Sequence, residues 1–176
     1  MLRSLIQDRR GVSAVEFALI APVMIVLYLA MTEVTMGLMA NRRADHVASA
    51  IGDLVAQVST TSTDDISDVF TVGEAIMSPF PTGSLNMRLS SVKADAGGTP
   101  KVVWSRSQGL ALPAYADNTV IDLPDDLVAP GESVIMSETR YTYTSPVGQI
   151  LPTPLRFNDV YYLRPRRATE VTCSSC

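Results

Sequence analysis

A carboxylate, Glu16, stands at the start of an apolar segment that carries no other charge as far as Met31. On insertion scales a charged side chain costs about 2.5–3.5 kcal/mol at the centre of a bilayer, so a membrane helix rarely keeps one without a partner. Two basic residues, Arg9 and Arg10, and then Gly11 precede the segment. The sequence therefore predicts that Glu16 has a partner of opposite charge in the assembled protein.

The chain ends in a cysteine pair, Cys173 and Cys176. The two thiols cannot complete a zinc site alone, because structural zinc takes four ligands and the single histidine, His46, is distant in the sequence. A redox-active C-x-x-C motif normally opens a helix, for which no chain follows here. The alternatives that remain are a local disulfide, a bridge to a partner chain, and two reduced thiols. Either bridge fits an exported domain.

Two groups of polar residues have both a chemical and a structural interpretation. His46 follows Asp45, but adjacent residues of a helix do not face one another, so a solvated or packed histidine is expected. Three acids, Asp122, Asp125 and Asp126, do not have the spacing of a calcium-binding EF-hand loop, which favours a solvated acidic turn. We expect no metal and no cofactor.

The aromatic residues of the later segments could line a binding patch, but strand aromatics more often pack in a core or pair across strands. They are Trp104, Tyr141, Tyr143, Tyr161 and Tyr162. A late basic group could meet anionic lipid or a partner, although a solvated strand end is the simpler interpretation; it comprises Arg164, Arg166 and Arg167. No nucleophile-elbow, Walker or zinc-protease motif occurs, and the sequence does not predict an enzyme.

The composition suggests one modest domain with an anchor. The chain has 176 residues, of which 47% are hydrophobic, and the apolar excess lies near the N-terminus. The net charge of −4 argues against nucleic acid as a partner, since such proteins carry a basic face.

The segment 12–31 is long enough to cross a membrane, because a helix of this length measures roughly 30 Å. It is too long for the core of a secretory signal peptide, and no convincing small-residue cleavage site ends it. The leader residues Arg3, Arg9 and Arg10, offset by Asp8, favour a cytoplasmic N-terminus. Arg42 and Arg43, beyond the apolar segment, weaken this preference without reversing it. Pro22 is expected to kink the helix, which membrane helices tolerate.

Beyond the membrane the pattern predicts helices first and strands later. A helix over 39–58 continues the membrane segment, and a second helix over 64–77, capped by Thr63, should pack on a sheet. Strands are expected at 84–93, 100–106, 132–144 and 157–164, the first two forming a hairpin through Asp95–Gly98. The stretch 107–131 is expected to be a surface excursion. This order predicts an α+β fold with an antiparallel sheet.

The N-terminal pattern resembles a type IV prepilin: Gly11 ends a short basic leader, Glu16 is the fifth residue after it, and Phe17 the sixth. The string GVSAVEFALIAPVMIVLY is most similar to TadE-like pseudopilins, minor pilins of the tight-adherence (Tad/Flp, type IVc) pilus. VVWSR at 102–106, YTY at 141–143 and RPR at 164–166 extend the resemblance.

The resemblance implies a pilin-like fold and a processing step. A membrane prepilin peptidase would cut between Gly11 and Val12, removing a cytoplasmic leader, 1–11, from a transmembrane helix, 12–36, and an extracytoplasmic head, 37–176. Glu16 would then pair with the N-terminal ammonium of its own chain or of a neighbour. The partners implied are the inner membrane, the peptidase and other pilin subunits, with the head in the periplasm or outside the cell.

Two alternatives remain open from the sequence. One is a pseudopilin of a type II-like secretion apparatus, in which the same helix builds a short piston. The other, of a different class, is an uncleaved membrane-anchored domain that binds a soluble ligand in the periplasm.

Overall fold

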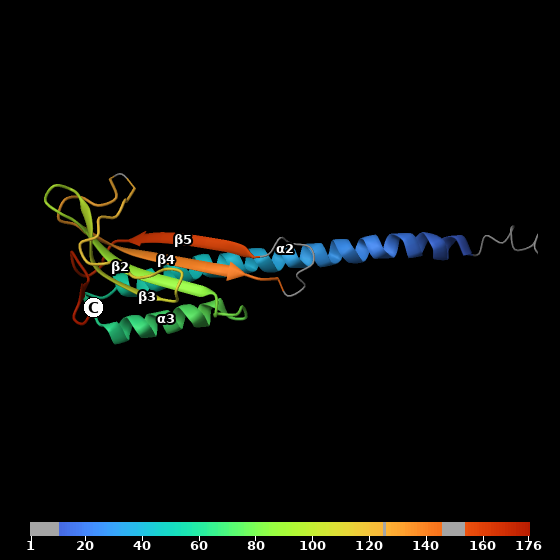
Figure 1. The fold of residues 1–176 in the computed structure, drawn as a ribbon, viewed down its shortest axis with the longest axis horizontal. Helices are drawn as coiled ribbons and strands as arrows, with labels where there is room; N and C mark the ends of the chain where they lie inside the picture. Colours follow the sequence, from blue (N-terminus) through green and yellow to red (C-terminus); the bar gives the residue numbers. More distant parts are fainter. Residues whose placement is uncertain (1–10, 125, 146–153) are drawn as a thin grey trace, which may run out of the picture.

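The fold is α+β and pilin-like, as the sequence predicts. The computed structural model describes residues 11–124, 126–145 and 154–176. One helix, α2 (Val12–Ala56), runs through both the apolar segment and the packed domain. The C-terminal part of α2 lies beside the sheet and the second helix, while its N-terminal part projects well beyond them (Figure 1).

The second helix, α3 (Thr63–Met77), begins at a capping box. The N-cap residue is Ser62 and not Thr63 as predicted: the Ser62 hydroxyl accepts the backbone N–H of Asp65, and the Asp65 carboxylate accepts the backbone N–H of Ser62. This reciprocal pair satisfies two otherwise unpaired donors, which Thr63 in the same place could not do with Asp65. The prediction for the cap was therefore wrong by one residue.

The main sheet has four antiparallel strands in the order β3-β2-β4-β5. Their bounds are β2 (Leu85–Ala94), β3 (Pro100–Gln108), β4 (Ser133–Tyr143) and β5 (Leu155–Leu163). The strands β2 and β3 form the expected hairpin, whose turn places Gly98 at a φ of +83°, a conformation that glycine adopts without strain. A small parallel pair that the sequence did not indicate joins β1 (Thr60–Thr61) to β6 (Thr172–Cys173).

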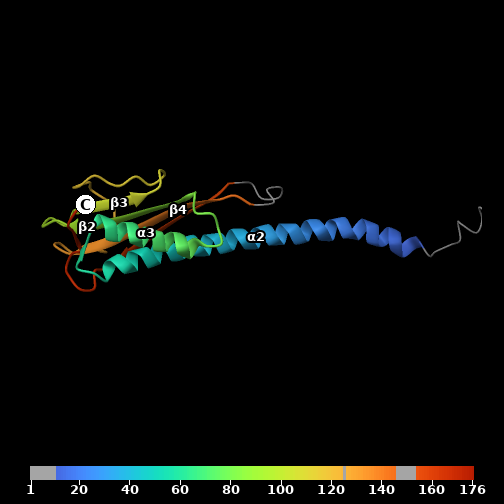
Figure 2. The ribbon, with the colours of Figure 1, turned by 90° about the horizontal axis from the view of Figure 1, so that it is seen from below.

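Both helices cover the same face of the sheet, and the main core lies between them and it (Figures 1 and 2). Small residues of α2 allow the close approach; those that are fully buried include Ala40, Ala44, Ala48 and Ala56. Two strand hydroxyls bond the helix backbone directly, Ser137 to the Ala48 carbonyl at 2.6 Å and Thr139 to the Ala44 carbonyl at 3.2 Å. The helix is thereby fixed against β4.

The stretch 107–131 is more than the surface excursion that the sequence predicted. It returns over the outer face of the sheet, where Val92, Val102, Val134 and Met136 form a second buried cluster. Side chains of the stretch cover this cluster, namely Tyr115, Ile121, Leu123 and Val128. The sequence did not predict this cover, because these apolar residues are spaced irregularly between prolines and have no helical or strand period.

Candidate processing and assembly site

The residue before α2 is a glycine whose conformation any residue could adopt. Gly11 has φ −87° and ψ −9°, and a Cβ built on it would meet no atom within 4 Å. Gly11 and Val12 are both exposed. Nothing in the described fold therefore requires a glycine at position 11, and the peptide bond that follows it is open to an enzyme.

Glu16 lies one turn into α2, on the same face as Val12. Residues four apart on a helix have their Cβ atoms about 5–6 Å apart, so a charge at position 12 would lie within reach of the Glu16 carboxylate. Glu16 is exposed, and no cation of the described residues lies within ion-pair distance of it. The partner that the sequence calls for is thus not a side chain of the described fold.

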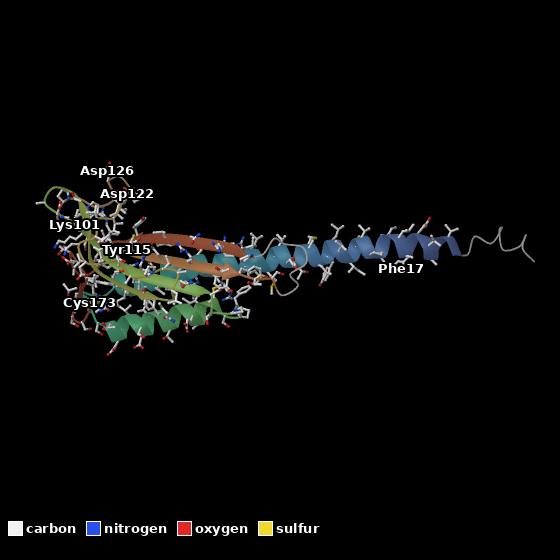
Figure 3. The ribbon with its side chains drawn as sticks, viewed as in Figure 1. Phe17, Lys101, Tyr115, Asp122, Asp126 and Cys173 are labelled. Carbon is white, nitrogen blue, oxygen red and sulfur yellow. A yellow bond between two sulfur atoms is a disulfide. The ribbon has the colours of Figure 1, made fainter. Side chains whose placement is uncertain are left out.

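The N-terminal half of α2 exposes large apolar side chains. Phe17 is 73% exposed and Met31 is 72% exposed. Phe17 lies on the part of α2 that projects beyond the sheet, far from the head (Figure 3). The most apolar window of the helix has a mean hydropathy of 2.2, and none of it is buried within the protein. Among the described residues, α2 is the one helix long and apolar enough to cross a membrane. Because this part of α2 lies outside the core, its apolar surface needs lipid or other apolar helices to cover it.

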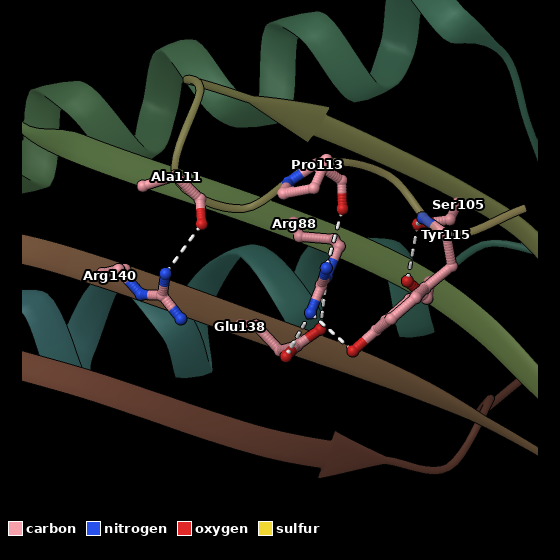
Figure 4. Close-up of polar contacts among 8 residues, drawn as sticks. Arg88, Ser105, Ala111, Pro113, Tyr115, Glu138 and Arg140 are labelled. Atoms are coloured by element: carbon pink, nitrogen blue, oxygen red, sulfur yellow. Dashed lines mark hydrogen bonds and ion pairs between the residues drawn. The ribbon is translucent and has the colours of Figure 1, made fainter. Parts of the chain in front are cut away.

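In the head, a segment that we call the strap, residues 109–115, is tied to the outer face of the sheet (Figure 4). Arg88, only 6% exposed, makes a two-pronged ion pair with Glu138 at 2.6 and 2.7 Å. The same guanidinium donates to the Pro113 carbonyl and to the Tyr115 hydroxyl. Each of the three guanidinium nitrogens of Arg88 donates at least one hydrogen bond, two of them to the carboxylate and two to the strap, so Arg88 fixes the strap in place.

Arg140, on the neighbouring strand, holds the start of the strap. Its Nη1 donates to the Ala111 carbonyl at 2.8 Å (Figure 4). Its Nε donates to the Asn158 side-chain oxygen on β5. Arg140 and Arg156 line an open hollow of about 500 Å³ on the outer face. Sequence reasoning missed this arrangement, since it depends on the register that places Arg140 opposite Asn158.

The aromatic residues considered for a binding patch belong mainly to the core. Trp104, Tyr141 and Tyr143 are each no more than 4% exposed, and the Trp104 indole N–H donates to the Val171 carbonyl. Burial raises the pKa of Tyr141 and of Tyr143 above the ordinary tyrosine value. These side chains are therefore structural.

Asp45 does not act with His46. The Tyr161 hydroxyl donates to Asp45 at 2.7 Å, and this hydrogen bond is the main cause of the raised pKa of Tyr161. His46 is exposed on the other side of the helix turn. Asp159, on the same strand as Tyr161, has a raised pKa because it is partly buried and, secondly, because Asp45 is near.

Of the three acids considered for calcium, Asp122 and Asp126 lie at the end of the head away from the bare helix (Figure 3), and Asp125 falls outside the described residues. Among the described residues, no group of three or more histidine, cysteine or acidic side chains could hold a metal ion.

Cys173 and Cys176 are joined by a disulfide in the structure. The small loop that it closes lies against the start of α3, where the Ser175 hydroxyl accepts the Thr63 backbone N–H at 3.0 Å. Arg106 donates to the Ser175 and Cys176 carbonyls. The bridge thus holds the C-terminal residues over the start of α3 and beside β1.

These features define a class: a pilin-like α+β protein whose first helix exposes an apolar half with a carboxylate near its start. The sequence model of the family described as TadE-like protein matches residues 11–52, from the glycine before α2 to the packed half of the helix. The resemblance to TadE-like proteins is thereby confirmed for this segment. A comparison with curated proteins found no match, and a comparison with solved structures found none.

Proposed function

We propose that the protein is a minor pseudopilin that takes part in the assembly of a Tad/Flp-type pilus, in its initiation or capping, and so contributes to surface adhesion. A prepilin peptidase cuts the chain between Gly11 and Val12 on the cytoplasmic face of the inner membrane. The mature subunit stays anchored by α2, with its head in the periplasm, until it joins other pilin subunits. Its role is structural, with no catalysis.

The observation that carries this proposal is that two features occur together at the start of α2: Gly11 just before the helix and Glu16 one turn into it. The fold places no steric demand for glycine at position 11, so its small size serves recognition by another protein. Cleavage there turns the Val12 amide into an ammonium, one helical turn from Glu16. Opposite charges at contact distance in a low dielectric attract strongly, whereas a lone carboxylate there is costly. Cleavage therefore supplies the partner that Glu16 lacks.

The exposed apolar half of α2 supports the same proposal. In the membrane its side chains contact lipid, and in a filament they contact the equivalent helices of neighbouring subunits. Both surroundings are apolar, so the transfer from one to the other costs little hydrophobic free energy. The Glu16–ammonium pair then sets the register between subunits.

Cleavage is tested by the intact mass of the protein extracted from its native membrane. We expect the mass of a chain that begins at Val12, with or without a methyl group on its nitrogen. In a Gly11→Val variant we expect the full-length mass and an unchanged head, because a side chain at position 11 meets nothing in the fold. A full-length wild-type chain would contradict the proposal and favour an uncleaved, anchored domain.

Assembly is tested by Glu16→Gln, which removes the charge and keeps the size, together with Glu16→Ala. We expect both variants to be cleaved and to fail in pilus assembly, scored by electron microscopy in cells that lack the wild-type gene. Ser13→Ala, an exposed substitution one turn earlier on the same helix, is the matched control and should assemble normally. Normal piliation in both Glu16 variants would exclude the assembly role of this carboxylate.

A membrane-anchored binding domain is the second candidate, because the head has an open hollow of about 730 Å³ at the end away from the membrane helix. Lys93, Asp95 and Lys101 line it with several apolar residues. Such a domain needs no cleavage, so the mass measurement separates the two candidates. A secretion pseudopilin shares the cleaved helix, and neighbouring genes for a pilus or for a secretion system would distinguish it.

A further inference from the structure

Four arginines lie at the base of the head, at the level where the exposed apolar half of α2 passes into the half that packs on the sheet. We call them the basic belt: Arg42, Arg43, Arg140 and Arg156. Their common level follows from two contacts. The Thr139 hydroxyl donates to the Ala44 carbonyl, which places its neighbour Arg140 at the level of that turn of α2, on the opposite face of the sheet. A Cβ on Gly37 would meet Leu155 at 3.5 Å, which places Arg156 close above Gly37. The belt therefore spans about 10 Å along the helix axis.

The basic belt differs from most of the cations further out on the head; Arg106 and Arg167 are the further cations for which the described residues show no ion pair. Beyond the belt, Arg88, Lys93, Lys101, Arg164 and Arg166 each form an ion pair with a carboxylate. Within the described part of the chain, no carboxylate lies within ion-pair distance of any belt arginine. Arg43 donates to the Ile76 carbonyl and Arg140 to uncharged groups, so all four positive charges stay uncompensated.

Arg140 and Arg156 also lie close to one another. Arg140 is opposite Asn158 and Arg156 is opposite Thr142, so the two arginines are diagonal neighbours on adjacent strands and line one hollow. Diagonal neighbours on adjacent strands lie within reach of long side chains, and an anion between the two guanidinium groups would offset their mutual repulsion. The arrangement is therefore suited to an anionic group.

The position of the basic belt along the axis of α2 indicates which kind of anion it binds. Large exposed apolar side chains continue along α2 from Val12 to Leu38 and Met39. This segment is roughly 40 Å long, which matches a bilayer together with its headgroup layers. Arg42 follows within one turn, so the belt stands at the membrane surface, where long arginine side chains reach the phosphate groups.

We propose that the basic belt binds the phosphate groups of anionic phospholipids in the leaflet beneath the head. The bound lipids hold the head against the membrane in one orientation before assembly. The belt also accounts for Arg42 and Arg43, which oppose the expected distribution of positive charge across the membrane. This proposal rests on α2 spanning a bilayer and is independent of cleavage and of the pilus.

The test uses the full-length chain in nanodiscs of phosphatidylcholine and phosphatidylglycerol, extracted gently and examined by native mass spectrometry. All samples carry neutral residues in place of the leader arginines, so that only the head side differs. We expect the reference protein to retain phosphatidylglycerol over phosphatidylcholine. In the double variant Arg42→Gln/Arg156→Gln this preference should fall about tenfold or more, since each arginine near an anionic surface contributes about 1 kcal/mol.

The variant is chosen to leave the fold intact, because both arginines are exposed and neither side chain forms a hydrogen bond with the described residues. The matched control, Arg164→Gln/Arg167→Gln, removes two charges beyond the belt and should keep the preference. An equal loss in both variants, or none in the belt variant, would overturn the proposal. Displacement of the lipid by inorganic phosphate would assign the belt to free phosphate instead, and loss of co-purifying subunits without loss of lipid would assign it to a protein partner.

Discussion

The two halves of α2 are one continuous helix but are built for different surroundings. From Val12 to Thr32 the helix exposes large apolar side chains, Phe17 among them, and buries none of its residues. From Glu33 to Ala56 it turns one face toward the sheet, and the residues buried on that face are mainly small. The first half leaves its apolar surface to be covered from outside, whereas the second half is covered by the rest of the same protein.

The acids of the two halves differ in the same way. Asp45, in the packed half, accepts a hydrogen bond from Tyr161 on the facing strand. Glu16, in the bare half, is offered no cation by the described fold. The bare half thus leaves a carboxylate without an ion-pair partner in the described fold, whereas the packed half provides Asp45 with a hydrogen-bond donor. This difference supports the proposed role of the bare half in assembly.

The sharpest way to test the packed half is to make the same substitution at two of its glycines. A Cβ on Gly52 would lie 2.5 Å from Leu163 Cδ1 and 2.8 Å from Ser137 Cβ, so β4 or the helix must move. We expect Gly52→Ala to lower the free energy of unfolding by about 2 kcal/mol. On Gly37 the added Cβ makes ordinary contacts at 3.5 Å or more, and Gly37→Ala should be neutral or stabilise by up to about 1 kcal/mol.

Urea unfolding of the full chain in detergent, followed by fluorescence of the single tryptophan, Trp104, measures both variants in the head. Ala18→Val, in the exposed half, adds apolar bulk outside the packed region and should leave the transition unchanged. Equal effects at Gly37 and Gly52 would show that helix propensity, and not the approach of β4, decides the outcome.

Much of this fold could be predicted from periodicity. The alternation in 84–93 and the turn at Asp95–Gly98 indicate the hairpin, and uninterrupted apolar spacing indicates α2. The parallel pairing of Thr60–Thr61 with Thr172–Cys173 could not be predicted, because two-residue strands have no period. The cover that the stretch 107–131 forms over Val92, Val102, Val134 and Met136 was missed because its apolar residues also have no regular spacing.

The candidate site divides along similar lines. Glu16 was singled out because a charge in an apolar segment can be recognised from the sequence alone, and Gly11, Val12 and Phe17 because of the resemblance to prepilins. The basic belt and the Arg88 anchor depend on strand register and on a long-range return of the chain, which single-sequence patterns do not contain. The assignment of roles to Gly11 and Glu16 stays a prediction until the mature N-terminus is measured.

The disulfide offers a way to destabilise the head at the start of α3, without touching α2. The bridge closes a loop of four residues over the start of α3. In the chain-entropy account of crosslinks a loop this short contributes about 2 kcal/mol, so Cys173→Ser/Cys176→Ser should lower the free energy of unfolding by about that amount. Dithiothreitol should lower the stability of the wild type equally and leave the double variant unchanged. An unaffected wild type would show that the bridge does not stabilise the head.

The smallest expected effect concerns two acids that lie close together in the head, Asp45 on α2 and Asp159 on β5. Asp159 is partly buried near Asp45, and its Oδ2 has no hydrogen-bond partner among the described residues. Its pKa is raised in the folded state, so the folded protein holds this proton more tightly than the unfolded chain does. The stabilising contribution is present below the unfolded pKa and is lost as the pH rises through the folded pKa.

Asp159→Asn should therefore stabilise the head by about 0.5–1 kcal/mol at neutral pH and by nothing measurable below the unfolded pKa of aspartate. Thermal unfolding at the two pH values, followed through Trp104, measures the difference. Asn158→Asp is the matched control: it places an acid on the outer face beside Arg140, where it should not destabilise at neutral pH. If the effect of Asp159→Asn did not depend on pH, burial would not disfavour the charged form of the Asp159 carboxylate. The contrast between Glu16 and the acids of the packed half would then rest only on the hydrogen bond that Tyr161 donates to Asp45.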